Sequence, residues 1–268
     1  MIGAAASPDL AQPVDEADLE RRFGGLRRLY GASAYGRLRA ARVAVVGLGG
    51  VGSWTVEALA RCGVARLVLV DLDHVAESNV QRQVQATTAT LGQAKAEALR
   101  ERIAQIHPGC EVHMVEAFVD GENWPALLPA EVDALVDACD QVRAKAALAA
   151  WALASGTSFV CAGAAGGKRQ AHRARVADLA EVTHDPLLAS LRQRLRQHHG
   201  AVRQGPMGIA CVASPEPVAP PAADCGFDPA TADGSLNCHG YGSTVTVTAT
   251  FGLLAADAVI AQWLARGG

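Results

Sequence analysis

The sequence predicts an α/β fold, a Rossmann-like doubly wound and mostly parallel sheet with helices on both faces. Apolar strand-like runs alternate with helical segments over residues 42–162. The first run, 42–46, leads into a glycine-rich turn at 47–52, and a second run, 67–70, ends in Asp71. A strand, a glycine turn, a helix and a strand that ends in an acid are, in this order, typical of a dinucleotide-binding unit.

The elements follow one another in a regular order. Residues 20–42 combine arginines with spaced leucines and predict a helix before the first strand. Downstream, the patterns predict a helix over 92–106 that stops at Pro108, strands over 112–115, 132–138 and 158–162, and an alanine-rich helix over 142–155. The almost continuously apolar run 132–138 is typical of a parallel strand buried on both faces.

The pattern changes after residue 167. Residues 168–203 contain eight Lys or Arg and four His against three acids. Within them, Asp185 and Pro186 predict the start of a helix with leucines on one face. Residues 214–233 are rich in Pro and Ala and predict a loop. We therefore expect a flexible tail over 1–20, a nucleotide-binding domain over 21–166 and a smaller C-terminal, substrate-binding part over 167–268 that ends in a helix.

Composition narrows the class of protein. Half of the 268 residues are hydrophobic but only 4% are aromatic, which predicts an aliphatic core. A net charge of −3 excludes a uniformly basic nucleic-acid binder but not a local basic patch. The seven cysteines never form a CxxC pair, and the acidic N-terminal segment does not resemble a signal peptide. These features predict a reduced, cytoplasmic protein without a zinc ribbon.

One segment is long enough to span a bilayer. Residues 245–264 contain a single charge, Asp257. Their threonines and alanines, together with that charge, favour a helix buried in a soluble protein. We expect no integral membrane span, and peripheral membrane contact by this segment stays open.

The glycine turn indicates nucleotide binding. Its glycines let the backbone turn tightly and approach a phosphate, which the N–H groups at the start of the next helix would bind. The four glycines expected to hold the cofactor are Gly47, Gly49, Gly50 and Gly52. Asp71 lies where a carboxylate accepts hydrogen bonds from ribose hydroxyls. These features alone fit NAD in hydride transfer and ATP in adenylation equally well.

Polar residues beyond the second strand favour ATP. Asp73, Asn79 and Arg82 follow that strand, and Lys95 opens the next helical segment. An enzyme that cleaves a triphosphate needs fixed cations for the developing charge. Asp137 and Asp140, after a later strand, carry carboxylates suited to Mg²⁺. We rank Asp140 first, because Asp137 is also placed to end the strand or cap the next helix.

Together these residues resemble the adenylating superfamily of ThiF and ubiquitin-activating type. The resemblance is carried by Gly47-x-Gly-Gly-x-Gly52, Asp71-x-Asp73, Asn79-x-x-Arg82-Gln83, Lys95 and Asp137-x-x-Asp140. Surrounding segments, such as Arg22-Phe23-Gly24-Gly25 and Gly163-Ala164-Ala165-Gly166-Gly167, are similar to the tRNA threonylcarbamoyladenosine dehydratases within it. The similarity covers nearly the whole chain except the N-terminal tail and the Pro-rich loop.

The resemblance implies specific roles. The glycine turn and Asp71 would hold the adenosine of ATP, and Asp140 would coordinate Mg²⁺. The phosphates would be bound by Asn79, Arg82 and Lys95. A homodimer would let Arg22 reach the triphosphate of the partner chain. The substrate would be tRNA carrying N6-threonylcarbamoyladenosine at position 37, whose threonine carboxylate is adenylated before the group cyclises.

Alternatives remain at this stage. The chain could adenylate the C-terminal glycine of a ubiquitin-like sulfur-carrier protein, although relatives of that type commonly carry CxxC zinc pairs. It could also be a non-catalytic scaffold in a cysteine desulfurase system. An NAD dehydrogenase is the weakest alternative, because no hydride-transfer site stands out. We interpret Cys238 as structural or sulfur-accepting, outside the catalytic core.

Overall fold

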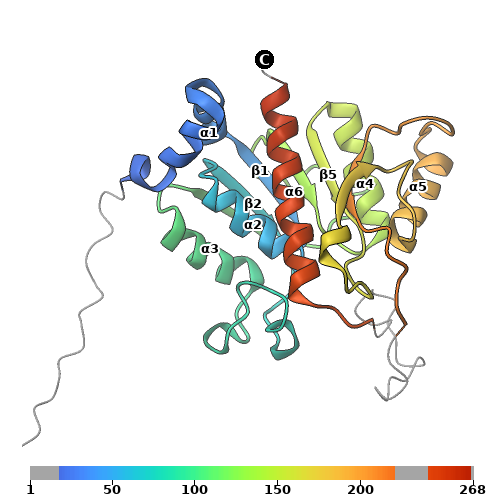
Figure 1. The fold of residues 1–268 in the computed structure, drawn as a ribbon, viewed down its shortest axis with the longest axis horizontal. Helices are drawn as coiled ribbons and strands as arrows, with labels where there is room; N and C mark the ends of the chain where they lie inside the picture. Colours follow the sequence, from blue (N-terminus) through green and yellow to red (C-terminus); the bar gives the residue numbers. More distant parts are fainter. Residues whose placement is uncertain (1–17, 221–240, 267–268) are drawn as a thin grey trace, which may run out of the picture.

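One seven-stranded sheet organises the chain in the computed structural model, which describes residues 18–220 and 241–266 (Figure 1). The strands lie in the order β3-β2-β1-β4-β5-β7-β6, and every neighbouring pair is parallel except β6 with β7. Their bounds are β1 (Arg42–Val46), β2 (Arg66–Val70), β3 (Glu111–Val115), β4 (Ala134–Asp137), β5 (Ser158–Ala162), β6 (Arg175–Asp178) and β7 (Ala210–Ala213). The predicted doubly wound fold is confirmed.

Helices cover both faces of this sheet. One face carries α1 (Leu19–Ala40), α2 (Gly52–Arg61), α3 (Lys95–Ile106) and α6 (Val245–Ala265), and the other carries α4 (Val142–Ser155) and α5 (Pro186–His198). Short 3₁₀ turns lie at Glu77–Asn79, Thr88–Thr90 and Ala171–Arg173. Each face has its own aliphatic core, exemplified by Leu59 and Phe251 on the first and by Leu148 and Leu191 on the second. These four side chains are fully buried.

Several boundaries differ from the sequence prediction. The helix expected from residue 92 begins at Lys95, because Gly92 has a φ of +82° and Ala94 pairs with His74 in a β-bridge. α1 is interrupted at Gly31, whose φ of +81° is not helical. The expected tail up to residue 17, residues 221–233 of the expected loop, and Cys238 lie outside the described residues.

The sheet also extends further than the sequence predicts. β6 and β7 come from the basic segment after residue 167 and its Pro-containing continuation, where no strand was expected. β7 inserts between β5 and β6 and is buried along three of its four residues. Strands from both sides of residue 166 therefore belong to one sheet.

The helix α6 packs against α2 and lies across β5 and β4 (Figure 1). A Cβ atom at Gly252 would lie 2.5 Å from the Val51 carbonyl oxygen and 2.6 Å from Trp54 Cβ, so only glycine allows this approach. By length and composition alone α6 could cross a membrane, yet 50% of its most apolar window is buried in the protein. The expected core helix is confirmed in its position on the sheet.

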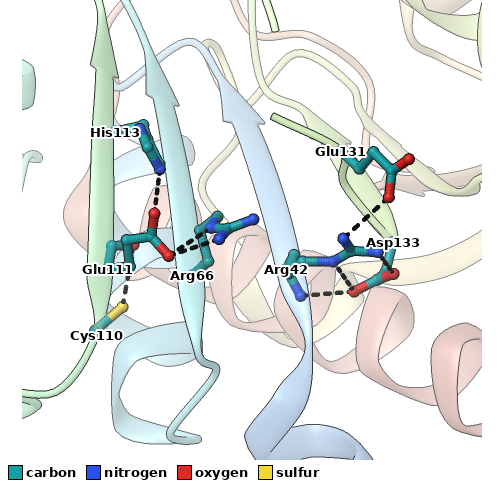
Figure 2. A network of polar contacts seen from close by, with 7 residues as sticks. All are labelled: Arg42, Arg66, Cys110, Glu111, His113, Glu131 and Asp133. Carbon is teal, nitrogen blue, oxygen red and sulfur yellow. Dashed lines mark hydrogen bonds and ion pairs between the residues drawn. The ribbon is translucent and has the colours of Figure 1, made fainter. Parts of the chain in front are cut away.

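Ion pairs connect the strands at their amino ends, as Figure 2 shows. Arg42 at the start of β1 donates to Asp133, just before β4, through Nε at 3.0 Å and Nη2 at 2.7 Å. Arg66 at the start of β2 lies 2.7 Å from the Glu111 carboxylate on β3. Two-point arginine–carboxylate contacts favour one geometry, so these pairs support the strand register. Because these ion pairs lie at the amino ends of the strands, they do not occupy the carboxyl ends, where a ligand would bind.

The first helix is anchored by a buried histidine. His107, at the end of α3, is only 1% exposed and lies edge-on to Phe23 of α1, with ring centroids 4.8 Å apart. The Arg39 Nη1 atom lies 3.0 Å from His107 Nε2. Burial, together with Arg39 and Arg22, lowers the pKa of His107 to about 4. The imidazole is therefore neutral in the folded protein at neutral pH.

This histidine makes the stability of the fold depend on acidity. In the unfolded chain His107 takes a proton below its ordinary pKa of 6.5, whereas the folded protein resists protonation until about pH 4. The free energy of unfolding should fall as the pH drops from 6.5 to 4, by up to ~3 kcal/mol from this residue. Urea titrations at pH 7 and pH 5 test this. His107→Gln should reduce the difference, and exposed His172→Gln should leave it unchanged.

Candidate active site

The glycine turn brings the first turn of α2 directly over the end of β1. A Cβ atom at Gly52 would lie 1.7 Å from the Gly47 carbonyl oxygen, so no other residue fits there. Val51 caps α2 without a side-chain hydrogen bond. The first N–H groups of a helix lack partners within the helix and attract anions. The start of α2 thus has the geometry of the phosphate-binding element that the sequence predicts.

The carboxylate of Asp71 holds this turn in place. Its Oδ2 atom accepts the Leu48 N–H at 2.6 Å, and its Oδ1 atom accepts the Asp73 N–H at 2.8 Å. Each carboxylate oxygen has a second lone pair, so these bonds leave acceptor capacity for ribose hydroxyls. Asp71 therefore both fixes the loop and lines the space above it.

A cavity of about 340 Å³ opens at the carboxyl ends of the central strands. Strand pairing brings Val46, Val70 and Asp137 level at this edge. The cavity is lined by nine of the residues that the sequence nominates: Gly47, Gly49, Gly50, Asp71, Asp73, Asn79, Arg82, Lys95 and Asp140. Ligands of open α/β sheets bind at this edge, where the strand order reverses between β1 and β4.

Two cations line this cavity, and each is held by the protein. The Lys95 ammonium is 7% exposed and lies 2.7 Å from Asp73 Oδ2. Arg82 donates from Nη1 to the Ser78 carbonyl at 2.7 Å. Burial lowers the pKa of the Arg82 guanidinium, but an arginine keeps its charge at neutral pH. Both charges therefore lie at the cavity where the sequence predicts phosphate groups.

Two helices also support the backbone of Arg82. Its carbonyl accepts the Trp54 Nε1–H of α2 at 3.1 Å and lies 3.4 Å from Thr248 Oγ1 of α6. Asn79 turns inward, and its Oδ1 accepts the Ala76 N–H at 3.0 Å. The loop that follows β2 is therefore ordered by hydrogen bonds to itself and to elements far along the chain.

The structure adds a residue that the sequence interpretation missed. Lys145 of α4 and Asp137 of β4 are both fully buried, with Nζ and Oδ2 3.1 Å apart. Burial opposes the charge, but the Asp137 carboxylate raises the pKa of Lys145 above its usual range. Lys145 Nζ also donates to the Cys139 carbonyl at 3.0 Å, which holds the turn that leads to Asp140. A lysine among the alanines of the helix 142–155 was the available signal.

Asp137 and Asp140 consequently have different surroundings. Asp137 is engaged by Lys145 and also accepts the Cys139 N–H at 3.1 Å. Asp140 lines the cavity instead. In the described ranges 18–220 and 241–266, no three His, Cys, Asp or Glu residues cluster as a metal site. A single carboxylate beside bound phosphates is nevertheless a common arrangement for Mg²⁺, so Asp140 fits that ion.

A second wall of the cavity comes from the C-terminal half of the chain. It contains residues 163–166 after β5, Leu187 of α5 and Tyr241 before α6. Asp185 joins two of these parts, because Oδ1 accepts the Leu188 N–H at 3.0 Å and Oδ2 accepts the Ala164 N–H at 2.9 Å. Asp185 thus caps α5, as predicted. Burial raises the pKa of this carboxyl group.

Arg22 lies outside this cavity in its own chain. Its Nη1 atom donates to the carbonyls of Ile106 at 2.7 Å and Gln105 at 3.2 Å, at the end of α3. A cation there interacts favourably with the helix C-terminus. Any contact of Arg22 with a nucleotide would therefore need a second copy of the chain.

Comparison with known proteins agrees with this geometry. The chain is 41% identical to the tRNA threonylcarbamoyladenosine dehydratase of Escherichia coli, over 92% of this chain and 94% of that protein. It is 38% identical to the Haemophilus influenzae protein of the same name, over 92% of this chain and 95% of that one. A crystal structure of the E. coli dehydratase with ATP superposes with a TM-score of 0.84 at 38% identity, covering 94% and 99% of the two chains.

A family model extends this similarity to almost all described elements. The model described as the ThiF family matches residues 24–265, from within α1 to the last residue of α6. That match includes the glycine turn, both cavity cations and Asp140. The chain therefore belongs to the ThiF family.

Proposed function

We propose that this protein is an ATP-dependent dehydratase that cyclises N6-threonylcarbamoyladenosine at position 37 of tRNA. One observation carries the proposal. A single cavity brings together the glycine turn, Asp71, Arg82, Lys95 and Asp140, in a chain that matches a dehydratase crystallised with ATP and with AMP over more than nine-tenths of its length. A tRNA substrate is consistent with the cytoplasmic location that we propose.

The residues on the nucleotide side of the cavity account for ATP binding. Asp71 holds the ribose, and the glycine turn and the start of α2 bind phosphate oxygens through backbone N–H groups. The cations of Arg82 and Lys95 neutralise the charge of the leaving pyrophosphate. Together with the uncharged amide of Asn79 they also orient it. These groups are held before ATP arrives, so little reorganisation is needed when charge develops.

The reaction has two steps. An oxygen of the threonine carboxylate bonds to the α-phosphorus, the bond from that phosphorus to the bridging oxygen breaks, and pyrophosphate leaves. A nucleophilic atom of the same carbamoyl group then bonds to the activated carbonyl carbon. The bond to AMP breaks, and the proton of the nucleophile passes to solvent. Adenylation of the carboxylate is required because AMP is a far better leaving group than oxide. Ring closure within the substrate needs no sulfur acceptor on the protein.

Mg²⁺ is the ion that Asp140 would hold. When bound, it neutralises charge on the phosphates. Lys145 supports this role because it fixes the carbonyl of Cys139, next to Asp140.

We also assign a homodimer to the active form, in which Arg22 of one copy contacts the triphosphate bound by the other.

Residues 167–268 form the proposed tRNA-binding part, although β6 and β7 share the sheet with the nucleotide site. Their basic segment, 168–203, suits the phosphate backbone of tRNA, because such binding depends mainly on Lys and Arg.

Adenylation of a sulfur-carrier protein stays as the alternative function. Molybdopterin-synthase adenylyltransferase of E. coli is 39% identical to this chain, but over 46% of it.

Pyrophosphate release separates these functions. Purified protein with ATP and Mg²⁺ should release pyrophosphate and form the cyclic nucleoside only with tRNA that carries threonylcarbamoyladenosine. Matched tRNA lacking that group and a carrier protein ending in Gly-Gly serve as the other two substrates. Release with the carrier alone would assign the chain to sulfur transfer, and release with none would reject both enzymatic functions.

Replacing Lys95 tests the phosphate site. Lys95→Met should lower the rate of pyrophosphate release about 100-fold or more, because one fixed cation is lost from the transition state. Its partner Asp73 is more than half exposed, so stability should change little. Arg100→Ala on the exposed side of the same helix is the matched control and should keep full activity. A Lys95→Met enzyme with the wild-type rate would contradict the assignment.

A further inference from the structure

The second wall of the cavity has a chemistry of its own. We call it the acceptor wall and define it as Gly163, Ala164, Ala165, Gly166, Leu187 and Tyr241. None of these six side chains is charged at neutral pH, whereas the nucleotide side carries Arg82, Lys95 and three aspartates. The acceptor wall therefore suits a small, uncharged or hydrogen-bonding chain better than it suits phosphates.

Two backbone donors on this wall have no hydrogen-bond partner among residues 18–220 and 241–266. The Gly163 N–H donates to the Val212 carbonyl at 2.8 Å, and the Ala164 N–H donates to Asp185. Within the described part of the chain, the N–H groups of Ala165 and Gly166 make no hydrogen bond. Ala165 is only 8% exposed. Buried N–H groups are nearly always paired, so the Ala165 N–H indicates a ligand with an acceptor oxygen. The half-buried Gly166 N–H, one residue further on, offers such a ligand a second donor.

The wall is held rigidly from behind. Asp185 is 4% exposed and bonds both the wall and the first turn of α5. A Cβ atom at Gly163 would lie 2.2 Å from its carboxylate, so the backbone is packed directly on it. Next to the wall, the buried Lys168 donates to the His184 carbonyl at 2.8 Å. The donors of Ala165 and Gly166 are thus fixed before any ligand binds.

The acceptor wall is also adjacent in the chain to the basic segment. The basic segment 168–203 follows residue 167 directly and contains α5, whose residue Leu187 is part of the wall. The wall is therefore next in the chain to the segment proposed to bind tRNA.

We propose that the acceptor wall binds the threonylcarbamoyl group of the substrate nucleotide. The N–H groups of Ala165 and Gly166 donate to its ureido or carboxylate oxygens, and Leu187 contacts the methyl group of its threonine. This assignment rests on the proposed function. It gives the carboxylate a place beside the nucleotide half of the same cavity, where adenylation occurs.

Gly166→Val tests the acceptor wall. The backbone of Gly166 has no positive φ, and a Cβ atom would lie 3.4 Å from Tyr241 Cβ, so the change adds a side chain at little cost to the fold. Displacing the substrate group by about 1 Å should lower kcat/KM for modified tRNA ~100-fold. ATP affinity and affinity for unmodified tRNA should stay within about twofold of wild type. Gly121→Val, at an exposed turn with free space, is the control.

The results of these assays distinguish a wrong acceptor-wall assignment from a wrong proposed function. Wild-type kcat/KM in a folded Gly166→Val protein would overturn the assignment, and so would a parallel loss of ATP affinity, because the wall would then belong to the nucleotide. Should Gly166→Val fail to fold by circular dichroism, Gly166→Ala and Leu187→Ala carry the same test through KM for the free modified nucleoside. A wild-type enzyme that cyclises no tRNA would instead reject the proposed function itself, and the assignment with it.

Discussion

The contact between the first turn of α2 and the carbonyl of Gly47 determines where the rest of the site lies. With no side chain at Gly52, α2 starts directly above the end of β1. Leu48, inside that turn, then connects the next elements, because its N–H reaches Asp71 and its carbonyl accepts Gln85 Nε2 at 3.0 Å. The end of β2 and the loop that carries the phosphate-binding residues are both attached to one tight turn. A larger residue at 52 would separate all of them.

Each positively charged side chain of the site either lines the cavity or is neutralised by a buried carboxylate. The ammonium of Lys95 is fixed by Asp73 but stays at the cavity, and the Arg82 guanidinium donates to the Ser78 carbonyl. Lys145 differs, because the buried Asp137 neutralises it and it acts only through the backbone of Cys139. Breaking such a buried pair leaves an uncompensated charge, which is costly. The protein thus separates the two cations that line the cavity from the lysine that fixes the backbone beside it.

Local patterns were sufficient for much of this structure. The strands at 42–46 and 158–162 and the helix 142–155 follow from apolar runs and from glycine and proline positions, which act over a few residues. That nine nominated residues would line one cavity was predictable, because parallel strands bring their carboxyl ends together. β6 and β7 were not, since four-residue strands rely on neighbours distant in sequence. Lys145 and the support of Arg82 by Trp54 and Thr248 depend in the same way on contacts that no local pattern encodes.

The position of α6 has a consequence for biosynthesis. This helix is made after every other described element, yet it covers the buried face of α2 and supports Arg82. While the chain emerges from the ribosome, the first βαβ unit is complete but the apolar surface of α2 is uncovered. Domains generally fold as units, and uncovered apolar surface promotes aggregation. The nascent chain therefore exposes the apolar surface of α2 until α6 docks, and only then does the Arg82 carbonyl gain its contact with Thr248.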